Sequence, residues 1–149
     1  MRGARRHDAR PDLPDLVARL KRQARKLTEP RQAVLGVLRA QAHPRAVKEI
    51  FASLPPGLCD LATVYRCLHL LERIGMVKRY ELGDGLARFE LLGEGDDGHH
   101  HHLVCTRCSG IVEVEDCSIA ELERRLAVEK GFAAVTHRLE FFGICPACQ

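Results

Sequence analysis

The chain has 149 residues, 46% of them hydrophobic and 29% charged, which is typical of one or two small globular domains and excludes a disordered chain. No apolar run approaches the roughly 18 residues of a transmembrane helix, and no apolar stretch follows the charged N-terminus, so we expect neither a membrane span nor a signal peptide. The expected location is the cytoplasm, where seven cysteines indicate metal ligands or buried thiols rather than disulfides.

Charge is distributed unevenly along the chain. Residues 1–80 carry 17 Lys and Arg against 7 Asp and Glu, a net charge of +10, whereas residues 81–149 carry 6 against 13, a net charge of −7. The acidic part also holds five of the eight histidines and five of the seven cysteines. We therefore predict a polyanion as the partner of the first part and metal cations as ligands of the second.

The first part of the chain is predicted to begin with a mobile arm and three helices. Arg, Gly and Pro dominate residues 1–11, the expected arm, and apolar residues recur at helical spacing among basic ones over 15–26. The Thr-Glu-Pro sequence at Thr28 is typical of a helix start, with the Thr28 hydroxyl as N-cap, and this helix is expected to end near residue 42. A third, short helix is predicted over 46–54.

The next predicted helix, residues 61–74, has two distinct faces. Its apolar stripe is formed by Leu61, Val64, Leu68 and Leu71. Its opposite face carries Arg66, His69 and Arg73, with Tyr65 at the border. Such a helix packs on one side and offers cations and an aromatic ring on the other.

A β-hairpin is predicted after this helix, from strand-like runs at 76–82 and 86–91 around a Gly-Asp-Gly turn. Helices followed by a hairpin predict a winged helix-turn-helix domain over residues 1–92, with 93–98 as a linker.

Residues 99–149 are predicted to form a small α/β unit, so the expected fold class is α+β. Strands are expected at 103–105, 111–115 and 133–142. Between the last two, a helix is expected over 118–130, with Ile119, Leu122 and Leu126 facing inward.

Two Cys-x-x-Cys motifs, Cys105/Cys108 and Cys145/Cys148, frame this second unit. Each motif places two thiolates on one side of a tight turn, and two motifs complete a tetrahedral Zn²⁺ site with no open position. The predicted zinc is therefore structural. The alternatives are unrelated buried thiols or a redox pair.

A run of four histidines, His99 to His102, precedes the first Cys motif. In an extended segment His100 and His102 share one face while His99 and His101 share the other, so the run can serve two metal sites. A solvated loop is the alternative. Cys117 lies beside acidic residues, which allows a metal role, but a buried thiol at a helix start fits it equally well.

The sequence Leu61-Ala-Thr-Val-Tyr-Arg66, the segment His99–Cys108, and Thr136-His137 followed by Cys145 together resemble the ferric-uptake regulator (Fur) family of metal-dependent transcription repressors. The resemblance runs from about Arg25 to the C-terminus. It implies a homodimer whose N-terminal winged helix binds an AT-rich palindromic DNA operator and whose C-terminal unit, residues 99–149, mediates dimerisation.

The resemblance also implies residue roles. DNA contacts fall on Lys26, in the minor groove, and on Thr63, Tyr65 and Arg66. A regulatory metal site falls on His43, Glu90, His100 and His102. A second metal site falls on His99, His101 and His137, where the usual glutamate position is held by Ala120, so that the site either takes Glu121 or is incomplete.

The expected function is that of an Fe²⁺-sensing repressor of metal-uptake genes, because imidazoles and a carboxylate suit Fe²⁺, Mn²⁺ or Zn²⁺. Zinc-uptake and peroxide or manganese regulators of the same family are the alternatives. We do not expect an enzyme, because a zinc hydrolase would need three protein ligands, an open position and a general base.

Overall fold

The structure is a computed structural model that describes residues 11–23, 26–93, 99–114 and 117–149. Most of the predicted arm and of the predicted linker lies outside these residues. The chain divides into two compact units, Met1–Gly98 and His99–Gln149. Among the described residues, no helix is long and apolar enough to cross a membrane.

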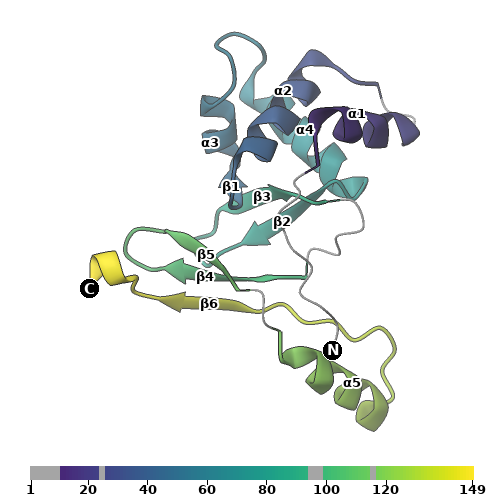
Figure 1. The fold of residues 1–149 in the computed structure, drawn as a ribbon, viewed down its shortest axis with the longest axis vertical. Helices are drawn as coiled ribbons and strands as arrows, with labels where there is room; N and C mark the ends of the chain where they lie inside the picture. The colour runs from purple at the N-terminus through teal and green to yellow at the C-terminus, as the bar shows by residue number, and fades with distance from the viewer. Residues whose placement is uncertain (1–10, 24–25, 94–98, 115–116) are drawn as a thin grey trace. The chain divides into compact units, whose positions relative to one another are not determined.

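The first unit combines helices with a small antiparallel sheet (Figure 1). Its helices are α1 (Leu13–Arg22), α2 (Glu29–Ala40), α3 (Val47–Ala52) and α4 (Leu61–Arg73). Its strands are β1 (Arg45–Ala46), β2 (Val77–Glu81) and β3 (Ala87–Leu91), in the order β1-β3-β2. The predicted winged helix-turn-helix is confirmed, and β1, which is too short to show a periodic pattern, adds a third strand.

The bounds of the first two helices differ from the prediction. The carboxylate of Asp12 caps α1 by accepting the Asp15 N–H at 2.8 Å, and the helix ends at Arg22 rather than at residue 26 because Gln23 leaves the helical conformation. Thr28 holds the N-cap position of α2, but its hydroxyl makes no capping hydrogen bond with any described residue, so the predicted cap is wrong. This helix ends at Ala40, because Gln41 is extended.

The core of the first unit is formed by the apolar faces of all its helices. The stripe predicted for α4 is confirmed, since Val64, Leu68 and Leu71 are fully buried. They pack in one apolar cluster with residues of the other helices and of the hairpin, among them Leu16, Leu20, Val34, Leu35, Ile50, Met76 and Phe89. This packing fixes α4 with its polar side exposed.

The predicted hairpin is confirmed as β2 and β3, which pair from Val77 opposite Leu91 to Glu81 opposite Ala87. Its turn requires two glycines, because Gly83 and Gly85 adopt φ values of 78° and 73° that side chains with a Cβ disfavour. Asp84 between them accepts two hydrogen bonds from the Arg88 guanidinium, at 2.8 and 2.6 Å, which hold the turn.

The second unit is built on a mixed sheet with the strand order β5-β4-β6 (Figure 1). Its elements are β4 (His101–Cys105), β5 (Ile111–Val114), α5 (Ile119–Lys130), β6 (Glu140–Gly143) and the short 3₁₀ helix η1 (Pro146–Cys148). Strand β4 pairs antiparallel with β5 and parallel with β6. The strand predicted over 133–142 is mostly loop, and Ala134 in it has a positive φ of 53° that a strand excludes.

Large apolar side chains remain exposed in the second unit. Leu122 and Leu126, predicted to face inward from α5, are 40% and 37% exposed, so that expectation is wrong for the single chain. Leu103 pairs with Val112 on one side and Phe141 on the other, and all three are at least 40% exposed. One face of the sheet therefore carries an apolar row across its three strands.

Candidate metal centres

The four consecutive histidines divide between two faces of the chain, as the alternation of an extended segment predicts. The rings of His100 and His102 lie 5.0 Å apart, centroid to centroid. The rings of His99 and His101 form a separate pair at 5.5 Å. Three of the four residues are buried, which argues against a solvated loop.

The four cysteines of the two Cys-x-x-Cys motifs come together in the second unit. Their sulfur atoms all lie within 4.8 Å of one another, and Cys108 Sγ is 3.8 Å from Cys145 Sγ. A tetrahedral Zn²⁺ with Zn–S bonds of about 2.3 Å implies S···S separations of about 3.8 Å, whereas a disulfide bond measures about 2.05 Å. The group Cys105, Cys108, Cys145 and Cys148 therefore fits a structural zinc.

The backbone of the first turn is shaped around these sulfurs. Ser109 adopts a positive φ of 58°, and its N–H donates to the Cys105 carbonyl at 2.9 Å, closing the turn. A Cβ added at Gly110 would lie 3.3 Å from Cys108 Sγ, so glycine leaves room for the thiolate. The Thr106 N–H donates to the Gly143 carbonyl at 2.8 Å, which connects this turn to the end of β6.

Two of the four cysteines have pKa values that are shifted in opposite directions. The Cys145 N–H donates to Cys105 Sγ at 3.4 Å. Among several hydrogen bonds to this sulfur, it contributes most to lowering the pKa of Cys105, which falls to about 6. Hydrogen bonding with Cys145, followed by that with Cys108, raises the pKa of Cys148 to about 12. Cys105 and Cys148 therefore do not both ionise near neutral pH unless a metal ion compensates their charge.

His100 and His102 share their face of the sheet with an acidic residue, Glu113, that was not among the predicted ligands. Glu113 lies opposite His102 in the pairing of β4 with β5, and its Oε1 is 3.9 Å from His100 Nδ1. The side chain of His100 is 3% exposed and that of Glu113 25%. A carboxylate within the apolar run Ile-Val-Glu-Val was the available signal, but its meaning depends on strand register.

The other two ligands predicted for the regulatory site belong to the first unit. His43 is exposed on the loop between α2 and β1. Glu90 lies in β3, opposite Lys78 of β2. The union of these two residues with His100 and His102 of the second unit stays a prediction.

A second histidine group contains a thiol. His99, His101, His137 and Cys117 each place one ligand atom within 4.8 Å of the others. Glu121, the carboxylate predicted for this site, is instead paired with Arg124 at 2.5 Å, and its side chain is 76% exposed. The structure thus places Cys117, and not Glu121, with the three histidines.

Two hydrogen bonds orient the rings in this group. Glu123 Oε1 accepts from His137 Nδ1 at 2.7 Å, and the Leu139 carbonyl accepts from His101 Nδ1 at 3.1 Å. Burial lowers the pKa of His101, which favours its neutral form at neutral pH. Both rings consequently direct Nε2 toward the centre of the group. Glu123 was missed because only its distance from His137 reveals its role.

The polar face of α4 carries three of the four residues predicted to contact DNA. Asp60 caps this helix by accepting the Thr63 N–H at 2.7 Å, and Arg66 donates to the Thr63 hydroxyl at 2.8 Å. Tyr65 is 42% exposed on the same helix. Lys26, the fourth residue, is exposed ahead of α2. A basic, aromatic helix face of this kind suits the major groove of DNA.

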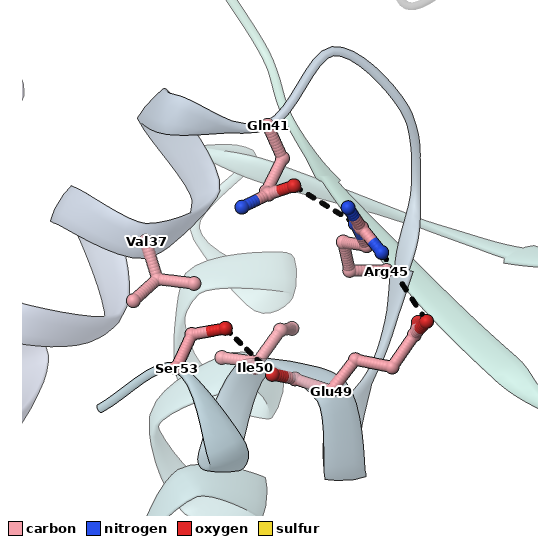
Figure 2. Close-up of a pocket in the computed structure, with 6 residues that line it drawn as sticks. All are labelled: Val37, Gln41, Arg45, Glu49, Ile50 and Ser53. Atoms are coloured by element: carbon pink, nitrogen blue, oxygen red, sulfur yellow. Dashed lines mark hydrogen bonds and ion pairs between the residues drawn. The ribbon is translucent and has the colours of Figure 1, made fainter.

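A small pocket in the first unit does not fit a small-molecule effector. Figure 2 shows Arg45 at its edge, donating to Gln41 at 2.9 Å and paired with Glu49 at 3.3 Å. The pocket has a volume of about 60 Å³, well below the roughly 300–1,000 Å³ of ligand sites. The Arg45 contacts join the end of α2 to α3 and are structural.

Comparison with known proteins places this geometry among metal-dependent regulators. The family model described as the ferric uptake regulator family matches residues 22–142. The peroxide-responsive repressor PerR of Staphylococcus aureus is 32% identical over 141 residues, covering 93% of this chain and 92% of that protein.

Solved structures agree in fold. The ferric uptake regulator of Vibrio cholerae superposes with a TM-score of 0.71 at 30% identity, covering 88% of this chain and 100% of the other. The ferric uptake regulator of Pseudomonas aeruginosa with manganese gives a TM-score of 0.67 at 29% identity, covering 87% and 97% of the two chains.

Proposed function

This chain belongs to the ferric uptake regulator family, and from that premise we propose that it represses metal-uptake genes in response to Fe²⁺. The family consists of metal-responsive transcriptional regulators, so we propose a regulatory role in the cytoplasm and no enzymatic one. The observation that carries the iron assignment is the His100/His102 pair beside Glu113 on the buried face of β4. Imidazole and carboxylate donors suit Fe²⁺ and Mn²⁺, and equally accommodate Zn²⁺.

His43 and Glu90 would complete this regulatory site from the DNA-binding unit. A metal ion held by both units favours one arrangement of the two recognition helices over others. The coupling free energy is the difference between the free energies of metal binding to the DNA-competent arrangement and to the other arrangements of the two units. Linkage requires that DNA binding increase the metal affinity by the same factor by which metal increases the DNA affinity. Metal binding thereby increases the affinity of the protein for its operator.

We propose that two copies of α4 bind an AT-rich palindrome, one in each half-site. Tyr65 and Arg66 would contact base edges in the major groove while Lys26 reaches the minor groove, and Thr63 orients Arg66 through the observed hydrogen bond. The net charge of +10 on residues 1–80 supports the association through phosphate contacts.

The second copy is supplied by dimerisation through the second unit. The exposed row Leu103, Val112 and Phe141 runs across its sheet, and Leu122 and Leu126 are exposed on α5. Apolar surface of this extent marks protein interfaces, and a palindromic operator requires a symmetric partner. The zinc held by the four cysteines would stabilise the end of this sheet.

A peroxide-responsive repressor is the second candidate, because the S. aureus relative with that name is 32% identical over 93% of this chain. Operator affinity measured anaerobically with Fe²⁺, Mn²⁺ and Zn²⁺ in turn tests the primary proposal. Activation by Zn²⁺ alone would refute iron sensing. Adding hydrogen peroxide to the Fe²⁺-loaded and Mn²⁺-loaded complexes then separates the two candidates, since a peroxide sensor releases DNA only when it holds the redox-active ion.

A further inference from the structure

Four potential ligand atoms converge where the loop before β6 meets the start of β4 and the segment ahead of α5. His137 Nε2 lies 3.2 Å from His101 Nε2 and 3.4 Å from Cys117 Sγ. The ring of His99 is 4.9 Å from that of His137, centroid to centroid, and one of its nitrogens lies within 4.8 Å of the other ligand atoms. These residues are separated by up to 38 positions in the chain, so tertiary packing holds the group together.

The hydrogen bonds at the outer edge of the group fix which nitrogen is available. A carbonyl oxygen only accepts, so the bond from His101 to Leu139 requires the proton on Nδ1 and leaves the lone pair on Nε2. The carboxylate of Glu123 holds the His137 proton on Nδ1 in the same way. Two lone pairs at 3.2 Å repel unless a positive centre lies between them. Carboxylate–histidine–metal triads have this arrangement.

The spacing matches a tetrahedral metal site better than a shared proton. Zn–N bonds of about 2.0–2.1 Å and a Zn–S bond of about 2.3 Å imply N···N separations of about 3.3 Å and N···S separations of about 3.6 Å. The observed values are 3.2 and 3.4 Å. A shared proton would join two acceptor atoms, whereas here the ligand atoms of three imidazoles and one thiol lie around a common centre.

We propose that Cys117 is the fourth ligand of a three-histidine, one-thiolate site that takes Zn²⁺ in preference to Fe²⁺ or Mn²⁺. The thiolate is the reason for the preference, because sulfur ligands select zinc over the harder ions that oxygen ligands suit. Four protein ligands leave no open position, so the ion is held rather than exchanged with substrate. Glu123 is a positioning residue that orients His137.

The site goes beyond the proposed iron switch and does not depend on it. Its ligands all belong to the second unit, where the ion would connect β4, the start of α5 and the loop before β6. The chain would then hold two zinc ions of different ligand sets, one at each end of β4.

Cobalt absorption tests the thiolate directly. The protein is purified with zinc in the four-cysteine site, Co²⁺ is added, and elemental analysis confirms that one zinc per chain remains. Thiolate-to-cobalt charge transfer in the near ultraviolet then reports Cys117 alone, and we expect this band to saturate at one Co²⁺ per chain. Zn²⁺ should abolish it at stoichiometric amounts, whereas excess Mn²⁺ should not.

Three variants complete the test. Cys117→Ser should lose the band, Cys117→Asp should keep cobalt at the site without the band, and Cys59→Ser, a thiol of the other unit, should match the parent. Two results would overturn the proposal: no charge-transfer band in the parent protein, or an unchanged band in Cys117→Ser. Displacement of cobalt by Mn²⁺ as readily as by Zn²⁺ would refute the zinc preference.

Discussion

His101 and His102 are consecutive in β4, yet their rings belong to different candidate metal groups. The ring centroid of His101 lies 5.0 Å from that of His137, and the ring centroid of His102 lies 5.0 Å from that of His100. Cys105, at the end of the same strand, joins the four-cysteine group. One five-residue strand thus carries a candidate ligand of each group. Its neighbour β5 carries Glu113, whose oxygen lies 3.9 Å from His100. A distortion of β4 would therefore change the geometry of all three groups.

Replacing one ligand of the four-cysteine group should remove the zinc and the dimer. Cys108→Ser leaves three thiolates around an ion that needs four, and the sheet end that they stabilise is expected to loosen. Elemental analysis and size-exclusion chromatography measure both effects, with Cys59→Ser as the control. A folded parent protein with no zinc and four freely titratable thiols would contradict the structural role.

Zinc affinity at this group should rise with pH. Cys148, with a pKa raised to about 12, must lose its proton on binding at any ordinary pH, whereas Cys105, with a pKa lowered to about 6, is already ionised at neutral pH. Below about pH 6 Cys105 is also protonated and must release its proton when zinc binds. The slope of log affinity against pH should therefore be larger by one unit below about pH 6 than above it. Competition with a zinc chelator across pH 5 to 8 provides the measurement. A constant slope would show that Cys105 is not stabilised as a thiolate.

Arg66→Ala should weaken operator binding by about 1–3 kcal/mol and reduce the ratio of operator to random-DNA affinity, as the loss of a base contact does. Lys26→Ala should also weaken binding. Arg125→Ala, which removes a comparably exposed arginine from α5, should change neither quantity. Fluorescence anisotropy at matched salt measures all three variants. An unchanged specificity ratio in Arg66→Ala would mean that another element contacts the bases.

His43→Ala and Glu90→Ala should each lower the metal-induced gain in DNA affinity, expected at about 1–3 kcal/mol, without loss of zinc from the four cysteines. Glu113→Ala should act in the same direction, because its carboxylate faces His100. Glu81→Ala, on β2 and paired with Arg79, is the control for a lost surface charge. If Glu90→Ala responds to Fe²⁺ like the parent while His137→Ala does not, the sensing site is instead the group of His99, His101 and His137.

The sequence alone was sufficient for the features that depend on local spacing. The heptad-like stripe of α4, the Gly-Asp-Gly turn and the alternating histidines are short-range patterns, and the structure confirms each of them. Each Cys-x-x-Cys turn is local in the same sense, but the four sulfurs meet only because β4 pairs with β6. Local chemistry restricts these segments to few conformations.

Features that depend on long-range contacts were not predictable. Glu113 becomes a partner of His100 only through the register of β4 and β5, and Cys117 replaces Glu121 only because of the path of the chain into α5. Leu122 and Leu126 have the pattern of a buried face but are exposed in the single chain, because periodicity does not distinguish a core from an interface.

Glu123 and Glu121 lie two residues apart on α5 and allow a matched test of how the thiol-containing group is organised. Glu123 accepts a hydrogen bond from His137, whereas the carboxylate of Glu121 is exposed and pairs with Arg124. Loss of an outer carboxylate of this kind typically costs about 10–100-fold in metal affinity, so we expect Glu123→Gln to weaken Co²⁺ binding by that factor and Glu121→Gln to leave it unchanged. Titration of the charge-transfer band measures both variants. Weaker binding in Glu121→Gln with parent-like binding in Glu123→Gln would return the ligand role to Glu121 and contradict the hydrogen-bonded arrangement around His137.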